Sequence, residues 1–511
     1  MHRREGSCMH SSDEKLRKAN PAETPMKNGA YPAEMKPNAG SASRKHRYLS
    51  RILEIAIILA VVACVEIAAR ACFDGVHLAD YYNRDIRNLT EEKQKVKMVV
   101  LGASQVYHGC DTELLSDKLG GGDVIAAGVA SSTNVGNYYI MKDLLKRFDP
   151  EIVLIDLHWN TIMKQGDISY TRGNLLSMDR LPYLNQLEFA FKEFSLDQIP
   201  NVSAMFRFGG KLYSPQKLLK NYIRKKEVAG GKEKRVQHGN SVYIKNGFSA
   251  YVTSAGRGSM PAEHFVYSNE QNDAQELAWV KKTQKLCEDS GARVIYLTLP
   301  SSMSRVYSVE NNSDFHDFVN SLAKKSGTVY LDMNLLKDRE KTLPDTMFTD
   351  NLHLNVIGAN FISGELAKLI QKTMSGEDVS GYFYSDFAQM QKDVHRIVAC
   401  SAVSASLSDD GSSVTVQAYS LRNPDLEAQY RLLVSTDGKE YEELVPWQDS
   451  ETLTGDAAGL RNPKFRLEVR QKGQEDYDAY QNNITVTDAA GVPAAEGTDA
   501  ESEDSDLEFN S

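Results

Sequence analysis

Cysteine is scarce in this chain, and the spacings that would bind a metal ion or a phosphate group are absent. The six cysteines in 511 residues include no Cys-x-x-Cys pair, so no disulfide framework is predicted. The eleven histidines are scattered, and no His-Glu-x-x-His occurs. Gly120-Gly-Gly122 leads into a predicted strand and is typical of a turn rather than of a phosphate-binding loop. We therefore expect no metal and no cofactor.

An excess of basic residues is also absent. The formal net charge is -10 and the isoelectric point is near 5.7, which argues against a general nucleic-acid-binding protein. The length of 511 residues is typical of about two to four domains. The sparse cysteines neither require nor exclude an oxidising compartment.

The first feature that the sequence does contain is a polar start followed by a long apolar run. Residues 1–43 are polar and rich in proline, glycine and alanine, which predicts disorder. The run from Ile52 to Phe73 would span about 33 Å as a helix, enough for a bilayer core. Basic residues precede the run, and Asp74 and Asp80 follow it. The positive-inside rule then predicts a disordered cytoplasmic segment over 1–51, a transmembrane anchor over 52–73 and an extracellular remainder.

Two details leave alternatives to a plain anchor. Ala69-Arg-Ala71 fits a small-x-small cleavage site, so a removed signal peptide is the first alternative. Glu66 and Arg70 lie one helical turn apart inside the apolar run. Either the two side chains pair and reach the outer interface, or Glu66 faces an integral membrane partner.

From about Val96 the sequence alternates strand and helix patterns, which predicts a parallel sheet with right-handed crossovers. Mainly apolar runs predict strands at residues 96–101, 123–127, 152–157, 292–299 and 329–331, and the third of them is continuously apolar but for Asp156. Helical patterns lie between and after them, at residues 111–119, 134–148, 273–290, 314–325 and 355–374. Together they predict an α/β domain over residues 90–385.

An insertion interrupts this pattern between about residues 165 and 270. It is long for a loop, so we expect it to have its own structure or to form a lid. Residues 216–235 within it hold eight Lys or Arg and two Glu. This basic stretch is either a solvated helix face or a surface that meets an anionic polymer or lipid headgroups.

Residues 395–487 change to a period of two, as in Val414-Val416-Ala418, with turn signals such as Asp437-Gly438. The pattern predicts a small antiparallel β-sandwich, weakly similar to the immunoglobulin- or fibronectin-type accessory modules of surface proteins. The acidic tail over 488–511 is predicted to be disordered.

Five residues supply what an ester-cleaving or acyl-transferring site needs. Ser104 follows the first strand and could act as nucleophile, while Asp350 stands three residues before His353 and could hold its imidazole in one tautomer. Gly128 ends the second strand and Asn160 follows the third, where both could donate to an oxyanion. Each signal is weak alone, since such serines usually cap a turn and Asp-x-x-His usually begins a helix. Their order along the sheet makes the combination informative.

In this order and context, the residues resemble the four blocks of the SGNH, or GDSL-like, hydrolases. The closing block, Asp-x-Leu-His-x-Asn-x-x-Gly, matches closely, and the similarity covers roughly residues 96–375. The resemblance implies a flavodoxin-like parallel sheet with Ser104 as nucleophile, His353 as base and Asp350 as its orienter. It also implies an oxyanion hole formed by the Ser104 N–H, the Gly128 N–H and the Asn160 side chain.

Two departures from the family pattern argue against a free-standing lipase. The first block reads Gly-Ala-Ser rather than Gly-Asp-Ser, and in the third block His158 replaces the usual Gly and Thr161 the usual Asp. A membrane anchor before such a domain is similar to the branch that contains the teichoic-acid D-alanylation protein DltD and bacterial exopolysaccharide acetylation proteins. That branch implies an acylated surface polysaccharide or teichoic acid as substrate and a membrane-bound O-acyltransferase as partner.

The predicted function is a membrane-anchored, extracytoplasmic serine esterase or O-acyltransferase that acts on acyl esters of cell-surface glycans. The alternative is a catalytically idle glycan-binding or scaffold subunit of a membrane acyltransferase complex. His108 and His158 lie near the site residues in the sequence. Each is more often a structural or surface histidine than part of a pocket.

Overall fold

The computed structural model describes residues 40–73, 94–130, 132–163, 183–193, 196, 199–207, 209, 214–229, 237–238, 240–256, 258–259 and 265–487. The disorder predicted for residues 1–39 and 488–511 lies outside these residues. The chain divides into two compact units, residues 1–63 and 64–511.

A single long helix, α1 (Gly40–Phe73), runs across the boundary of the two units. It starts well before Ile52, inside the stretch expected to be disordered. Its portion Arg47–Cys72 contains an 18-residue window with a mean hydropathy of 2.6 and is long and apolar enough to cross a membrane. By length and composition it is compatible with a membrane anchor or a signal sequence.

The second unit contains a five-stranded sheet in which every pair of neighbours is parallel. Its strands are β1 (Gln94–Gly102), β2 (Val124–Gly128), β3 (Phe148–Asp156), β8 (Arg293–Thr298) and β10 (Val329–Asp332). Their spatial order is β10-β8-β3-β1-β2, the flavodoxin-like arrangement whose strand order reverses between β1 and β3. The predicted α/β fold class is confirmed.

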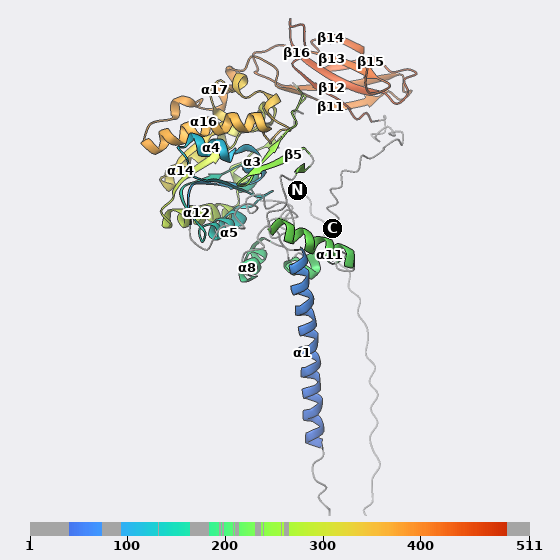
Figure 1. Cartoon of the computed structure of the whole chain (residues 1–511). Helices are drawn as coiled ribbons and strands as arrows, with labels where there is room; N and C mark the ends of the chain where they lie inside the picture. Colours follow the sequence, from blue (N-terminus) through green and yellow to red (C-terminus); the bar gives the residue numbers. More distant parts are fainter. Residues whose placement is uncertain are drawn as a thin grey trace, which may run out of the picture. The chain divides into compact units, whose positions relative to one another are not determined.

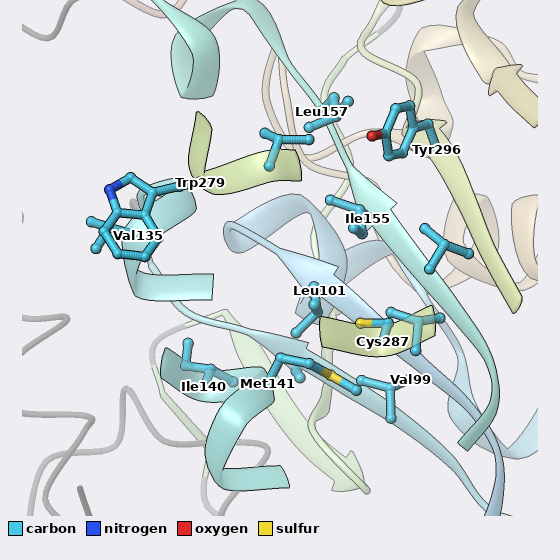
Figure 2. Packing of buried hydrophobic residues seen from close by; sticks show 14 of the residues in the cluster. Val99, Leu101, Val135, Ile140, Met141, Ile155, Leu157, Trp279, Cys287 and Tyr296 are labelled. Atoms are coloured by element: carbon cyan, nitrogen blue, oxygen red, sulfur yellow. The ribbon is translucent and has the colours of Figure 1, made fainter. Parts of the chain in front are cut away.

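Helices cover the two faces of this sheet (Figure 1). They are α4 (Thr112–Lys118), α5 (Asn134–Leu144), α12 (Ala274–Asp289), α14 (Asn312–Ser326) and α16 (Val356–Ser375). Successive β1 residues alternate between two cores, because side chains of a strand point to opposite faces. Val99 and Leu101 belong to the core on one face of the sheet, which also contains Met141 of α5 and Trp279 of α12 (Figure 2). On the other face, side chains of β1 pack with residues of α4 and α16.

The helix predicted over 134–148 is too long. Helix α5 ends at Leu144, and Phe148 already opens β3, where it pairs with Gln94.

The short elements around the sheet are α3 (Ser104–Gly109), α6 (Trp159–Ile162), α13 (Met303–Ser308), α15 (Arg339–Thr342), α17 (Phe387–Lys392), β9 (Val309–Glu310) and the 3-10 turns at Asn269–Gln271, Met333–Leu335, Asp345–Met347 and Ser380–Tyr382.

The expected insertion has its own secondary structure in the parts that the structure describes. It contains α8 (Tyr183–Glu193), a 3-10 turn (Ile199–Val202), α9 (Ala204–Arg207), α11 (Pro215–Ala229), β4 (Gln237–His238), β5 (Ser241–Lys245), β6 (Phe248–Tyr251) and β7 (Phe265–Val266). Strands β5 and β6 form an antiparallel hairpin across Asn246-Gly247. Both turn residues have positive φ, 49° and 93°, as a primed two-residue turn requires.

Two antiparallel sheets form the C-terminal part, as the period-two pattern predicted. Their orders are β11-β12-β15 and β14-β13-β16-β17. The strands are β11 (Ala399–Leu407), β12 (Ser413–Leu421), β13 (Ala428–Ser435), β14 (Glu442–Gln448), β15 (Thr452–Asp456), β16 (Lys464–Gln471) and β17 (Ala479–Gln481). Inward side chains of both sheets, including Val416 and Leu467, share one core.

Candidate active site

Ser104 lies at the carboxyl edge of the sheet, on a sharp turn from β1 into α3. The strand ends at Gly102 and the helix begins at Ser104. A Cβ on Gly102 would lie 2.5 Å from Val106 Cγ2 and 2.9 Å from Asp156 Cβ, so a side chain there would not fit. The turn therefore depends on this glycine, and it places Ser104 beside the point where the strand order reverses.

Asp350 and His353 lie on a tight turn just before α16. A short antiparallel bridge between Phe348 and Leu354 closes the turn. The Asp350 Oδ1 accepts hydrogen bonds from the backbone N–H groups of Leu352 and His353, at 2.8 and 2.9 Å. The carboxylate is therefore fixed by the backbone of its own turn.

The second oxygen of Asp350 lies 2.7 Å from Nδ1 of His353. Burial would raise the pKa of the carboxyl, but the hydrogen bonds from the His353 ring and from the two backbone N–H groups outweigh it. The pKa of Asp350 is therefore lowered from its ordinary value. The ionised carboxylate accepts the Nδ1–H, which leaves Nε2 of His353 as the acceptor of the neutral ring.

The structure brings Ser104 and His353 together although 249 residues separate them. The Ser104 Oγ lies 2.7 Å from His353 Nε2, so the hydroxyl can donate to the imidazole. The side chain of His353 is 19% exposed and that of Asp350 is 51% exposed. A hydroxyl, an imidazole and a carboxylate in this order can pass a proton away from the serine and support nucleophilic attack.

Gly128 and Asn160 lie at the same edge of the sheet. Gly128 ends β2 and pairs with Gly102 of β1. A Cβ on Gly128 would lie 2.6 Å from the Ala103 carbonyl oxygen and 2.9 Å from the Tyr107 nitrogen, so only glycine allows α3 this close to β2. Asn160 is exposed in the first turn of α6, which follows β3. Their role as oxyanion donors stays a prediction.

His108 packs against the candidate site and is held by strand β6 of the insertion. Its side chain is buried, and its Nδ1 lies 2.6 Å from the Ser249 carbonyl oxygen of β6, to which Nδ1–H donates. Its ring stacks on Tyr251 at 3.9 Å and meets the His353 ring edge-on at 5.4 Å. Burial lowers the pKa of His108 to about 3, so the ring is neutral at physiological pH.

Tyr251 is the neighbour of the site that the sequence analysis missed. Its ring centroid lies 5.8 Å from that of His353, and its backbone forms a parallel bridge with Asn355. The available signal was the Asn246-Gly247 dipeptide between two short alternating runs, which is typical of a hairpin. The β5–β6 hairpin thus carries part of the insertion to the candidate site.

His158, unlike His108, is part of the N-terminal cap of helix α6. Its side chain is buried and accepts from the Asn160 N–H at 3.5 Å, while the Thr161 hydroxyl accepts from the His158 N–H, so the two residues cap α6. Burial lowers the pKa of His158 to about 3. The departures of His158 and Thr161 from the family pattern therefore have a structural explanation, a helix cap.

Asp156 is a buried acid beneath the β1–α3 turn. It ends β3, is 1% exposed and accepts a hydrogen bond from the Leu299 N–H at 2.9 Å. Burial raises its pKa to about 7, because one hydrogen bond does not replace the hydration of a carboxylate. Its place behind Gly102 makes it part of the support of the Ser104 turn.

Comparisons with known proteins give little beyond this geometry. No protein-family model matches the chain, and no curated protein matches it. Among solved structures, the chain is similar to one described as a putative platelet activating factor from Streptococcus pneumonia, with 11% identity and a TM-score of 0.28 over 62% of this chain and 99% of that one. It is also similar to a gut microbial diltiazem-metabolizing enzyme, with 14% identity and a TM-score of 0.18 over 73% of each chain. Similarities this low carry no argument about function.

Proposed function

We propose that this chain is a membrane-anchored serine esterase or O-acyltransferase that acts on acyl esters of cell-surface glycans outside the cytoplasm. The observation that carries the proposal is the series of hydrogen bonds from Ser104 through His353 to Asp350, each 2.7 Å long. Ser104 is the nucleophile, His353 the general base and Asp350 the residue that orients His353. The five-stranded parallel sheet is the fold that the SGNH resemblance implies.

In the first half of the proposed reaction, the Ser104 Oγ attacks the carbonyl carbon of the acyl ester while its proton passes to His353 Nε2. The ring becomes imidazolium, which the ionised Asp350 stabilises. The oxyanion of the tetrahedral intermediate accepts hydrogen bonds from the Ser104 N–H, the Gly128 N–H and the Asn160 side chain. Collapse of the intermediate breaks the ester C–O bond, and the leaving alcohol takes the proton from His353.

In the second half, water or a sugar hydroxyl attacks the acyl-serine and gives its proton to His353. Collapse of the second intermediate returns that proton to Ser104 and releases a carboxylic acid or a new ester. The two outcomes differ only in the nucleophile that reaches the acyl-serine. We propose an acylated surface polysaccharide or teichoic acid as the substrate class and a membrane-bound O-acyltransferase as a partner, both from the resemblance to the anchored branch.

A fluorophosphonate probe tests the proposed function directly, because it labels only a serine whose hydroxyl is activated by a base. We expect labelling of the wild-type chain and none of Ser104→Ala. Ser116→Ala on α4 is the matched control, since Ser116 is a serine away from the site whose hydroxyl donates to the Gly122 carbonyl. Absence of labelling in the folded wild-type chain and in both variants would overturn the enzymatic proposal and favour an idle glycan-binding or scaffold subunit.

A further inference from the structure

The C-terminal end of α1 is tied to the insertion by a cluster of hydrogen bonds around Glu66. Its carboxylate accepts from the Ser203 hydroxyl at 2.7 Å and from the backbone N–H groups of Ala204 and Met205 at 2.9 and 3.1 Å. Arg70 donates to Glu66 at 2.7 Å and to the Val202 carbonyl at 2.9 Å. Glu66 is thus engaged within its own chain, which favours the pairing alternative over a role facing a membrane partner.

Apolar contacts also join the C-terminal end of α1 to the insertion. Ala69 of α1 and Ala204 of α9 are 1% and 0% exposed and pack together, with Cys72 of α1 and Leu218 of α11 against them. The end of the apolar helix therefore contacts both α9 and α11. If α1 spans a bilayer, these two helices start where it leaves the hydrocarbon region.

The same stretch of the insertion exposes large apolar side chains. Six of them are exposed by 40% or more: Phe191, Leu196, Phe206, Leu219, Tyr222 and Ile223. Single exposed apolar residues are normal on a soluble surface, but a group within one segment that contacts an apolar helix is typical of an interaction surface.

Helix α11 has the pattern of an interfacial amphipathic helix. Leu219, Tyr222 and Ile223 follow the i, i+3, i+4 spacing of one apolar face, and Lys226 ends this face with its Nζ 4.7 Å from the centre of the Tyr222 ring. Lys217 and Lys220 fall on another face and are exposed. A helix with an apolar face that is flanked by lysines is the type that lies in the headgroup region of a bilayer.

We propose that α8, α9 and α11 form a docking surface for an anionic phospholipid bilayer, beside the point where α1 leaves it. The apolar side chains of this docking surface would enter the interface, and the lysines would contact lipid phosphates. A soluble anionic polymer would satisfy the lysines but leave Leu219, Tyr222 and Ile223 in water, so the bilayer explains more of the surface. The inference rests on α1 spanning a membrane and not on the proposed chemistry.

Quenching of tryptophan by brominated acyl chains tests the docking surface in the full-length chain. Ile223→Trp is placed on the apolar face of α11, and Val403→Trp is the matched control at an exposed apolar position of β11, 68% exposed. The chain is reconstituted in nanodiscs of brominated phosphatidylcholine with or without phosphatidylglycerol. The wild-type signal is subtracted to remove the native tryptophans.

We expect quenching of Ile223→Trp with phosphatidylglycerol and none of Val403→Trp. Replacement of both Lys217 and Lys220 by Gln should lower the docking equilibrium by about 25-fold, since each lysine near an anionic surface contributes about fivefold. Equal quenching of the two tryptophan variants would overturn the proposal. Protection of α11 amides from hydrogen exchange by soluble poly(glycerol phosphate), with no effect of phosphatidylglycerol, would instead assign the surface to a polymer. Fluorophosphonate labelling in the same nanodiscs shows separately whether the Ser104 site is active.

Discussion

Asp350→Asn provides the sharpest test of the proposed site, because the structure fixes which way the new amide must face. Oδ1 of Asp350 accepts from two backbone N–H groups at 2.8 and 2.9 Å, while Oδ2 faces His353 Nδ1. An asparagine that keeps the first two bonds points its NH₂ group at Nδ1. The ring must then carry its proton on Nε2, which can no longer accept the proton of Ser104.

The opposite orientation of the amide is unfavourable. It would restore the bond from Nδ1–H but place NH₂ against both backbone donors, losing two hydrogen bonds of about 1 kcal/mol each. The variant also lacks the charge that stabilises the imidazolium in the transition state. In other Ser-His-Asp enzymes this change lowers kcat about 10⁴-fold. We expect a loss of about 10³- to 10⁴-fold here, equal to about 4–5.5 kcal/mol.

The second-order rate of fluorophosphonate labelling is the appropriate assay, because it needs no knowledge of the natural substrate. The free energy of unfolding should change by less than about 1 kcal/mol, since the Asp350 side chain is half exposed. Asp350→Glu keeps the charge but displaces it by one methylene, so it should lose less than Asp350→Asn. A labelling rate of Asp350→Asn within tenfold of wild type would refute the role assigned to this carboxylate.

Three further predictions concern the surroundings of Ser104. Asn160→Ala should lower turnover about 10²- to 10³-fold without unfolding the protein, and unchanged turnover of a model ester would refute its assignment as oxyanion donor. Gly128→Ala should lower the free energy of unfolding by about 1–3 kcal/mol in urea denaturation, because the methyl would lie 2.6 Å from the Ala103 oxygen, whereas Gly364→Ala, with nothing within 4 Å, should not destabilise. The pKa of Asp156 is raised to about 7 in the folded chain, so the protonated carboxyl stabilises the folded state at low pH. This contribution to the free energy of unfolding is lost as the pH rises toward 7. Asp156→Asn should therefore gain stability over wild type between about pH 4 and pH 8, by up to about 4 kcal/mol, and a difference between the two chains that does not change with pH would contradict the buried acid.

The sheet and the order of the site residues could be predicted from the sequence because both leave local signals. A strand covered on both faces is a continuous apolar run, as at Ile152–Ile155, and parallel strands bring their carboxyl ends to one edge. Ser104 and Gly128 each follow or end such a run. Asp350 and His353 lie three residues apart on one turn, so their contact is encoded locally.

The boundaries of the helices and strands, and the structure of the insertion, were harder to predict from the sequence than the sheet, for physical reasons. Phe148 is buried and apolar, and such a residue fits the end of a helix or the start of a strand equally. Phe148 belongs to β3 because its backbone pairs with Gln94 of β1, and the residues that follow Phe148 pair with the following residues of β1. The start of α1 at Gly40 likewise precedes the apolar run that signalled it.

The contact of Tyr251 with His108 and His353 could not be predicted from sequence patterns. Ser104 is positioned by the end of its own strand, and His353 by the backbone hydrogen bonds of its own turn. Both positions therefore leave a signal in the neighbouring sequence. Tyr251 comes instead from a hairpin of the insertion, and its packing on His108 and its backbone bridge with Asn355 bring its ring within 5.8 Å of His353. No spacing in the sequence encodes that approach. The same insertion carries α11, so the segment that borders the candidate site is covalently continuous with the proposed docking surface, and differences among related chains in this segment should alter both.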